Sequence, residues 1–188
     1  MAMNWIHQRI CSSKQWARLV RESTLPWVLD EVDLGERTLE IGPGYGANLK
    51  VLVEKTPDLT AVEIDPAMAA DLRREHGSRA KILQGDGASL ALPDEEFSSV
   101  VCFTMLHHVP TAGGQDALFS EARRVLSSGG VFAGCDSTDS LLMRALHIGD
   151  TYNPVPPETL QDRLAAAGFE EIATEHKGGK VRWRAVAV

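Results

Sequence analysis

The chain has 188 residues, enough for one domain, and its 44% hydrophobic and 24% charged residues are typical of a folded globular protein. A net charge of −7 argues against a general nucleic-acid binder, and no apolar run approaches the ~20 residues that span a bilayer. The start of the chain lacks the basic-then-apolar pattern of a signal peptide. Three widely spaced cysteines form no C-x-x-C pair, so we expect a reduced, cytoplasmic protein without a disulfide framework.

The first 37 residues have helical character. Residues 12–15 resemble a capping box, and apolar residues at helical spacing follow it. Three tryptophans of this segment, Trp5, Trp16 and Trp27, either shield the mouth of a ligand site or pack against the rest of the chain. We therefore treat residues 1–37 as a helical extension of a single domain.

The rest of the chain, residues 38–188, alternates between strands and helices. Strands are expected at residues 38–41, 59–63, 80–84, 98–104 and 130–135. Helices are expected at residues 47–54, 66–76, 115–126 and 157–167. In the second of these helices, Asp65 is a candidate N-cap, Pro66 the first helical residue and Gly77 the stop signal. Such an alternation predicts an α/β fold with a mostly parallel sheet and helices on both faces.

The end of the chain follows a different pattern. Ile172 and Thr174 alternate with polar residues before Gly178 and Gly179, and a second alternating run, 181–187, follows these glycines. Two alternating runs around a Gly-Gly turn predict a β-hairpin. We therefore expect the parallel sheet to end in an antiparallel pair of strands.

A glycine-rich loop follows the first expected strand and contains Gly42, Gly44 and Gly46. Glycines let the chain turn tightly and let a ligand touch the backbone, and the helix that follows offers unpaired N–H groups. The loop alone also fits a dinucleotide-binding pattern or a purely structural turn. However, Glu40 ends the strand just before it, and an anion there repels a pyrophosphate but suits an ammonium or sulfonium group.

Two further acids follow the next two strands. Glu63 ends the second strand, 23 residues after Glu40, where a carboxylate can accept both hydroxyl groups of a ribose. Asp86 follows the third strand, where its carboxylate can accept a hydrogen bond from an adenine amino group. Gly87 and Ala88 beside it leave room for the ring. Together these acids favour a nucleoside ligand.

Taken in order and at their spacing, these motifs resemble the class I S-adenosylmethionine-dependent methyltransferases from about residue 38 to the end of the chain. The resemblance implies a Rossmann-like, doubly wound, seven-stranded sheet of order 3-2-1-4-5-7-6, with strand 7 antiparallel and helices on both faces. It also implies S-adenosylmethionine as the cofactor. In this family the acid matching Glu40 and the backbone of the three loop glycines hold the methionine part, which Tyr45 either contacts or covers.

The resemblance assigns the remaining cofactor contacts by position. The acid matching Glu63 holds the ribose, and Ile64 packs against the adenine. Asp86, with Gly87 beside it, meets the adenine. Thr104 and Met105, at the end of the fourth strand, lie near the sulfonium.

The first half of the chain looks like the ribosomal-RNA adenine dimethylases, through Leu-Glu-Ile-Gly-Pro-Gly-Tyr-Gly and Ala-Val-Glu-Ile-Asp-Pro. Those enzymes carry an Asn-[Leu/Ile]-Pro-[Tyr/Phe] segment after strand four, whose aromatic ring stacks on the extruded adenine. This chain has residues 103–108, Phe-Thr-Met-Leu-His-His, at that place, and no basic RNA-binding domain. Residues 106–109, Leu-His-His-Val, instead resemble the branch that methylates small molecules such as quinones, sugars and lipid-like metabolites. We therefore expect a small-molecule acceptor and consider nucleic acid unfavoured.

Methyl transfer is an in-line displacement, in which alignment contributes most and a base is needed only for a protonated nucleophile. His107 and His108 lie where a base reaches the transfer point, and their adjacency allows one of them to face the substrate. A structural or cofactor-facing role is equally open for each. We expect His7, His76 and His176 at the surface.

Several metal-ligand residue types follow the fifth strand near the expected substrate opening. They are Asp136, Asp139, His147 and Asp150. Their spacing, with or without the two adjacent histidines, matches no metal motif, and a helix cap explains either of the first two acids, so no metal is expected. Two cysteines in expected strands, Cys102 and Cys135, are read as small core residues.

Three alternative functions remain open. A nucleic-acid or protein methyltransferase would be favoured by salt-sensitive binding of RNA through the basic ends of the chain. Residues 177–188, at one of these ends, hold four basic and no acidic residues. A nicotinamide-dependent reductase needs a pyrophosphate beside Glu40 and a catalytic domain for which no residues are left. A non-catalytic subunit that binds the cofactor and supports a partner is the third. Only residues 1–37 and about 137–157 remain to build a substrate lid. We therefore expect either an open site for a larger substrate or a small lid shared across a homodimer.

Overall fold

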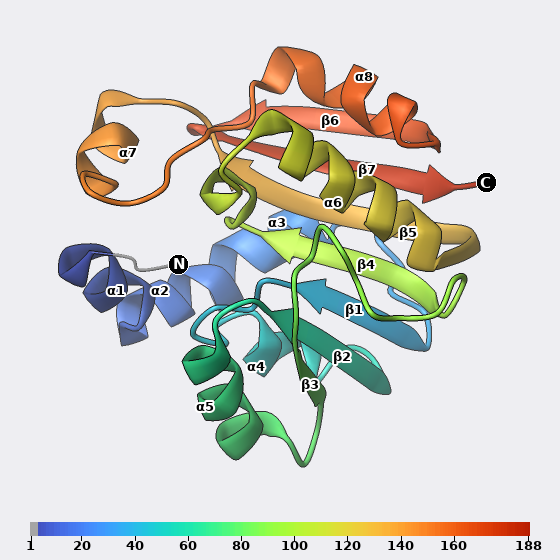
Figure 1. Ribbon diagram of the computed structural model, residues 1–188, viewed down its shortest axis with the longest axis horizontal. Helices are drawn as coiled ribbons and strands as arrows, with labels where there is room; N and C mark the ends of the chain where they lie inside the picture. Colours follow the sequence, from blue (N-terminus) through green and yellow to red (C-terminus); the bar gives the residue numbers. More distant parts are fainter. Residues whose placement is uncertain (1–3) are drawn as a thin grey trace.

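The computed structural model describes residues 4–188, which form one seven-stranded sheet flanked by helices (Figure 1). The strands are β1 Arg37–Ile41, β2 Asp58–Glu63, β3 Lys81–Gln84, β4 Phe97–Phe103, β5 Leu126–Ser137, β6 Phe169–Lys177 and β7 Lys180–Ala187. Their order is β3-β2-β1-β4-β5-β7-β6. The first five are mutually parallel, and β7 is antiparallel to both β5 and β6. The expected fold class, strand order and terminal hairpin are confirmed.

Helices cover both faces of the sheet, and each face has its own apolar core. On one face α6 (Ala112–Val125) and α8 (Pro157–Ala166) pack on β4, β5 and the hairpin (Figure 1). On the other face lie α3 (Leu25–Val28), α4 (Leu49–Leu52) and α5 (Pro66–His76). Burying these two layers is the main stabilising contribution in such a fold, since the driving force follows the apolar area removed from water.

The segment before β1 consists of α1 (Trp5–Cys11), α2 (Lys14–Leu19), a π-helical turn η1 (Val20–Thr24) and α3. The Ser13 hydroxyl accepts a hydrogen bond from the Trp16 N–H and caps α2. Val20, Leu25 and Val28 of η1 and α3 belong to the core cluster on their face of the sheet. The end of the extension is therefore packed into the core, while α1 and α2 project beyond it.

The three tryptophans of this segment have different surroundings. Trp5 is 72% exposed. The Trp27 indole N–H donates to Glu175, and the guanidinium of Arg182 lies 5.4 Å from the centre of its ring, so it packs on the hairpin. Trp16 alone lines the ligand pocket described below.

The sequence patterns place most elements within a few residues of their bounds. The helix after the glycine loop is shorter than the expected 47–54, because Gly46 still has left-handed backbone (φ +73°) and turns follow before α4 begins. One helix was not expected, α7 (Leu141–Leu146). It has no buried residue, and Leu141 and Leu142 are 85% and 78% exposed. Its short sequence is apolar at every position except Arg144, so it shows no alternation of apolar and polar faces that would predict a helix.

The expected burial of single residues is confirmed in part. Cys102 and Cys135 are buried in β4 and β5, and His176 is exposed. The expectation of surface positions for His7 and His76 is wrong, since both are buried. His76 closes α5 against the glycine loop, and a tertiary contact to Asp150 buries His7. Within residues 4–188, no helix combines the length and the apolar character needed to cross a membrane.

Candidate active site at the carboxyl ends of the strands

A pocket lies beyond the carboxyl ends of β1, β2 and β4. In open parallel sheets this edge, where the strand order reverses, is the usual place for a ligand. Eight of the residues expected in the site line the pocket, namely Gly42, Gly44, Tyr45, Glu63, Ile64, Thr104, Met105 and His108. Five expected residues do not line it, namely Glu40, Gly46, Asp86, Gly87 and His107.

The glycine loop forms the floor of the pocket, and its three glycines have left-handed backbone with φ of +70°, +55° and +73° at Gly42, Gly44 and Gly46. A Cβ at Gly42 would lie 2.9 Å from the Met105 side chain, and one at Gly46 would lie 2.8 Å from Leu72, so packing excludes larger residues there. At Gly44 a Cβ would meet nothing within 4 Å. The backbone at Gly44 is therefore open to a ligand in the pocket.

The Glu63 carboxylate is fixed at the pocket wall before any ligand binds. One oxygen accepts a hydrogen bond from the Gly44 N–H and the other from the Asp65 N–H, both at 3.0 Å. Asp65 itself caps α5 by accepting from the Ala67 and Met68 N–H groups, as expected. Each carboxylate oxygen keeps a further lone pair, so Glu63 can accept the two hydroxyl groups of a ribose.

The Glu40 carboxyl group is fully buried just behind the pocket, beside Asn48, which lines it. Neither of its oxygens has a hydrogen-bond partner among the residues that the structure describes. Burial raises the pKa of Glu40 to about 8; the Asn48 side chain lowers this pKa and the Glu63 carboxylate raises it further. Burying an unpaired carboxylate is costly, so this position suits a group that meets a cation.

Asp86 and Gly87 lie outside the pocket. Asp86 is exposed, and its carboxylate accepts the Ala88 N–H at 2.9 Å, which stabilises its own turn. A Cβ at Gly87 would lie 2.5 Å from Ile41, so this glycine is required by packing. The structure therefore gives both residues a local structural role, and the expected adenine contact stays a prediction.

Thr104 ends β4 at the pocket with a left-handed backbone (φ +50°), which is uncommon for a residue with a branched side chain. Its N–H donates to the Cys135 carbonyl at 2.7 Å, which holds it there. Met105 follows it and packs against Gly42. The end of β4 is thus held rigidly against the glycine loop.

The two adjacent histidines have different surroundings. His107 is 3% exposed, and its ring Nδ1 lies 2.6 Å from Asp136 Oδ1. The backbone N–H of His107 donates a hydrogen bond to the other carboxylate oxygen of Asp136. His108 lines the pocket, and the two ring centres are 4.2 Å apart. Burial, together with the neighbouring His107, His7 and His147, lowers the pKa of His108 to about 3. The His108 ring is therefore neutral at neutral pH.

The acidic residues at the end of β5 and after it take roles that the sequence did not indicate. Asp136 orients His107 and caps no helix, and Asp139 pairs with Arg144 at the surface. The cap of α7 is Ser140 instead. Asp150 binds His7 from the other end of the chain.

Sequence reasoning missed several residues that line the pocket. Asn48 and Met68 line the pocket, and neither belongs to a motif. His7 and Cys11 of α1 reach the pocket from a segment far from the motifs in sequence. Among the pocket residues of this segment, the sequence indicated only Trp16, as one of three tryptophans that could shield a ligand site.

Comparison with known proteins gives matches in sequence and in structure. A family model described as a methyltransferase domain matches residues 39–134. The demethylmenaquinone methyltransferase of Roseiflexus castenholzii is 36% identical over 100 residues, 52% of this chain and 41% of that protein. The ribosomal RNA small subunit methyltransferase A of Chlorobaculum parvum is 32% identical over 102 residues, 54% of this chain and 34% of that protein. The chain thus matches less than half the length of these curated relatives.

A solved structure from Pyrococcus horikoshii is similar over almost the whole chain. It has a TM-score of 0.80 at 18% sequence identity and covers 95% of this chain and 94% of its own. At that identity the likeness establishes the fold, and the pocket lies where this fold binds its ligands.

Proposed function

Because the chain belongs to the methyltransferase-domain family, we propose that it binds S-adenosylmethionine in the pocket and transfers the methyl group to a small-molecule acceptor. The observation that carries the proposal is the pairing of Glu63 with the open backbone of Gly44. One wall of the pocket thus presents two oriented carboxylate oxygens, and its floor presents backbone without side chains. That combination fits a ribose joined to a chain that lies along the loop.

The remaining contacts follow from the charges at each wall. Glu63 accepts the ribose hydroxyls, and Ile64 at the rim, 44% exposed, covers one face of the adenine. Glu40 and the loop hold the methionine part, because its ammonium supplies the cation that a buried carboxylate requires. Tyr45 lines the pocket beside the loop and covers this part. Asp86 meets the adenine only if its turn closes over the pocket.

The bound cofactor supplies the methyl group, which it carries on a sulfonium sulfur. The sulfur leaves as a neutral thioether, so no acid is needed to protonate the leaving group. The chain contributes alignment, which is worth up to ~7–11 kcal/mol of the barrier. Thr104 and Met105, held rigidly at the end of β4, form the wall beside the transfer point. The neutral His108 ring beside them accepts a proton or a hydrogen bond from the acceptor. His107, oriented by Asp136, is a positioning residue for that ring.

The mouth of the pocket supports a small acceptor with an apolar part. Trp16 lines both the pocket and an apolar groove on the outer side of α1 and α2. Trp5, Ile6 and Ile10 line the same groove and are 72%, 49% and 42% exposed. An apolar ring or tail fits this surface better than the phosphate backbone of a nucleic acid does.

The first experiment is calorimetric binding of S-adenosylhomocysteine, with NADH as the control ligand. Binding of the first ligand alone is expected. Binding of NADH, or of neither ligand, contradicts the proposal. Methyl transfer from labelled cofactor is then screened over quinones, phenols, amines and sugars, with ribosomal RNA in parallel. Transfer to RNA alone would replace the small-molecule acceptor by the activity named for the Chlorobaculum parvum relative.

A further inference from the structure

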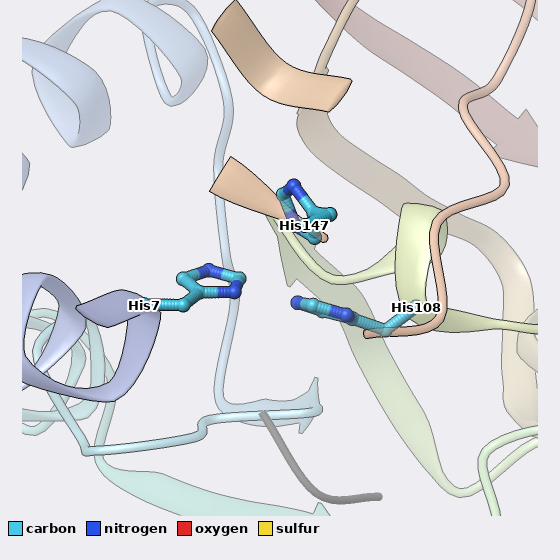
Figure 2. Close-up of side chains that lie close together, drawn as sticks. All are labelled: His7, His108 and His147. Carbon is cyan, nitrogen blue, oxygen red and sulfur yellow. The ribbon is translucent and has the colours of Figure 1, made fainter. Parts of the chain in front are cut away.

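Three histidines from distant parts of the chain meet beside the pocket. His7 comes from α1, His108 from the 3-10 turn η2 (Leu106–His108) after β4, and His147 from the residue that ends α7. Figure 2 shows their rings facing a common space from three separate segments. One ring nitrogen of each lies within 4.8 Å of those of the other two. Such a convergence of imidazole nitrogens is typical of zinc sites.

The outer nitrogens of two of these rings are already engaged. His7 Nδ1 lies 3.1 Å from an Asp150 carboxylate oxygen, and His147 Nδ1 lies 2.7 Å from the Met143 carbonyl oxygen. A histidine that binds a metal almost always donates its other N–H to a carboxylate or a backbone carbonyl. These contacts assign the proton to Nδ1 in both rings, which leaves the lone pair on Nε2 facing the common space.

The inner nitrogen of His147 has no partner. His147 is 3% exposed, and its buried Nε2 makes no hydrogen bond to any residue between 4 and 188. A buried polar atom without a partner costs ~1–3 kcal/mol, so a native structure normally supplies one. The rings of His7 and His147 are in edge-to-face contact, with centres 4.4 Å apart, but this contact does not satisfy the lone pair.

We propose that His7, His108 and His147 bind one divalent transition-metal ion, with Zn²⁺ as the best match. Three imidazoles with a fourth position left open are the ligand set of catalytic zinc. At a Zn–N length of about 2.0–2.1 Å, tetrahedral nitrogens lie roughly 3.4 Å apart, so the rings must close by about 1.4 Å at most. From the sequence we expected no metal, and we expected His7 at the surface.

The position of the ion gives it two consequences. It joins α1 and α7 to the end of β4, since one ligand comes from each of these places. His108 also lines the pocket, so the open position lies next to the cofactor site. Because the ion occupies the lone pair of the His108 ring, the ion takes over from that ring the role of activating the acceptor. An oxygen or sulfur atom of the acceptor is the ligand class that takes this position, a step that rests on the proposed function. Coordination there lowers the pKa of the acceptor group and readies it for methylation.

The test uses the whole, untagged chain after treatment with a chelator. Zn²⁺ is titrated by calorimetry, and Co²⁺ is titrated by its visible absorption, a readout independent of methyl transfer. We expect one ion per chain, with an intensity of the Co²⁺ bands typical of four-coordinate geometry. His7→Gln and His147→Gln each weaken Zn²⁺ binding at least tenfold, and Asp150→Asn weakens it by ~10–100-fold because it orients His7. His176→Gln, an exposed histidine on β6, is the matched control and leaves binding unchanged.

Two outcomes overturn the proposal. One is the absence of stoichiometric binding in the wild-type chain, and the other is equal affinity in the histidine variants and the control. Circular dichroism and S-adenosylhomocysteine binding are measured on every variant, so that loss of fold is not mistaken for loss of a ligand. A chain that binds S-adenosylhomocysteine but no metal refutes this site alone. A chain that binds metal but no S-adenosylhomocysteine refutes the proposed function alone.

Discussion

The buried Glu40 gives the sharpest test of how the pocket recognises its ligand. With a pKa of about 8, the carboxyl group holds a proton at pH 7 in ~90% of free molecules. A bound ammonium group favours the ionised form, so binding at pH 7 should release ~0.9 proton and binding at pH 9 only ~0.1. Affinity should therefore rise about tenfold from pH 6 to pH 7 and level off above pH 8. The Glu40→Gln variant keeps the shape and removes both effects.

Calorimetry of S-adenosylhomocysteine in two buffers of different ionisation enthalpy measures the released protons. The range from pH 6 to pH 7 is used because the amine of the ligand stays protonated there. Glu40→Gln should bind at least tenfold more weakly at pH 8 and show heats that do not depend on the buffer. Equal affinity of the two proteins at pH 8, or buffer-independent heats in the wild type, would refute the placement of the ammonium at Glu40.

The same carboxyl group makes a prediction for the free protein. Its pKa is raised in the folded state, so the folded state holds the proton more tightly than the unfolded state does. The stabilisation is fully present below the ordinary pKa of 4.5 and is lost as pH rises to about 8, by up to ~1.4 kcal/mol per pH unit. Urea unfolding should therefore show Glu40→Gln gaining on the wild type between pH 5 and pH 8. A constant difference over this range would contradict the raised pKa.

Four further substitutions, with one control, test the pocket. Glu63→Ala should weaken S-adenosylhomocysteine binding tenfold or more, because it removes charged hydrogen bonds worth ~1.5–3 kcal/mol each, and unchanged calorimetric affinity would contradict the ribose placement. Gly44→Ala and Gly178→Ala should impose a similar strain of ~1–2 kcal/mol, because the two glycines have similar φ, +55° and +58°, and an added Cβ meets nothing within 4 Å at either position. The two variants should therefore shift the thermal unfolding temperature alike, while only Gly44→Ala weakens S-adenosylhomocysteine binding. His108→Ala and His107→Ala should keep cofactor affinity nearly intact and lower turnover, and normal turnover in both would remove them from the mechanism.

Local sequence signals were sufficient where the chain interacts with itself nearby. Asp65 and Pro66 start α5 because a side-chain cap and a fixed φ act within one turn of the helix. Gly178 and Gly179 turn the terminal hairpin with positive φ at both positions. The strand order came from the family resemblance, since spacing alone does not determine which strands pair.

The incorrect expectations involve contacts that span the chain. His7 follows two apolar residues, Trp5 and Ile6, that are themselves exposed, and its partner Asp150 is 143 residues away in sequence. Asp136 resembled a helix cap by position, yet its carboxylate faces His107 across the ends of two parallel strands. The residue types and their spacing in the sequence do not show which distant side chains meet until the order of the strands in the sheet is known.

The family match includes only part of the residues that line the pocket. The family match ends at residue 134 and begins at residue 39, so it includes the glycine loop, Glu63 and His108. Three other residues that line the pocket, His7, Cys11 and Trp16, lie before the match, on α1 and α2. Residues within the match can therefore be shared with other methyltransferase domains, whereas α1 and α2 lie outside it. Exchanging α1 and α2 for those of a relative should change acceptor choice and leave S-adenosylhomocysteine affinity within a few-fold, whereas a large loss of affinity would show that these helices also build the cofactor site.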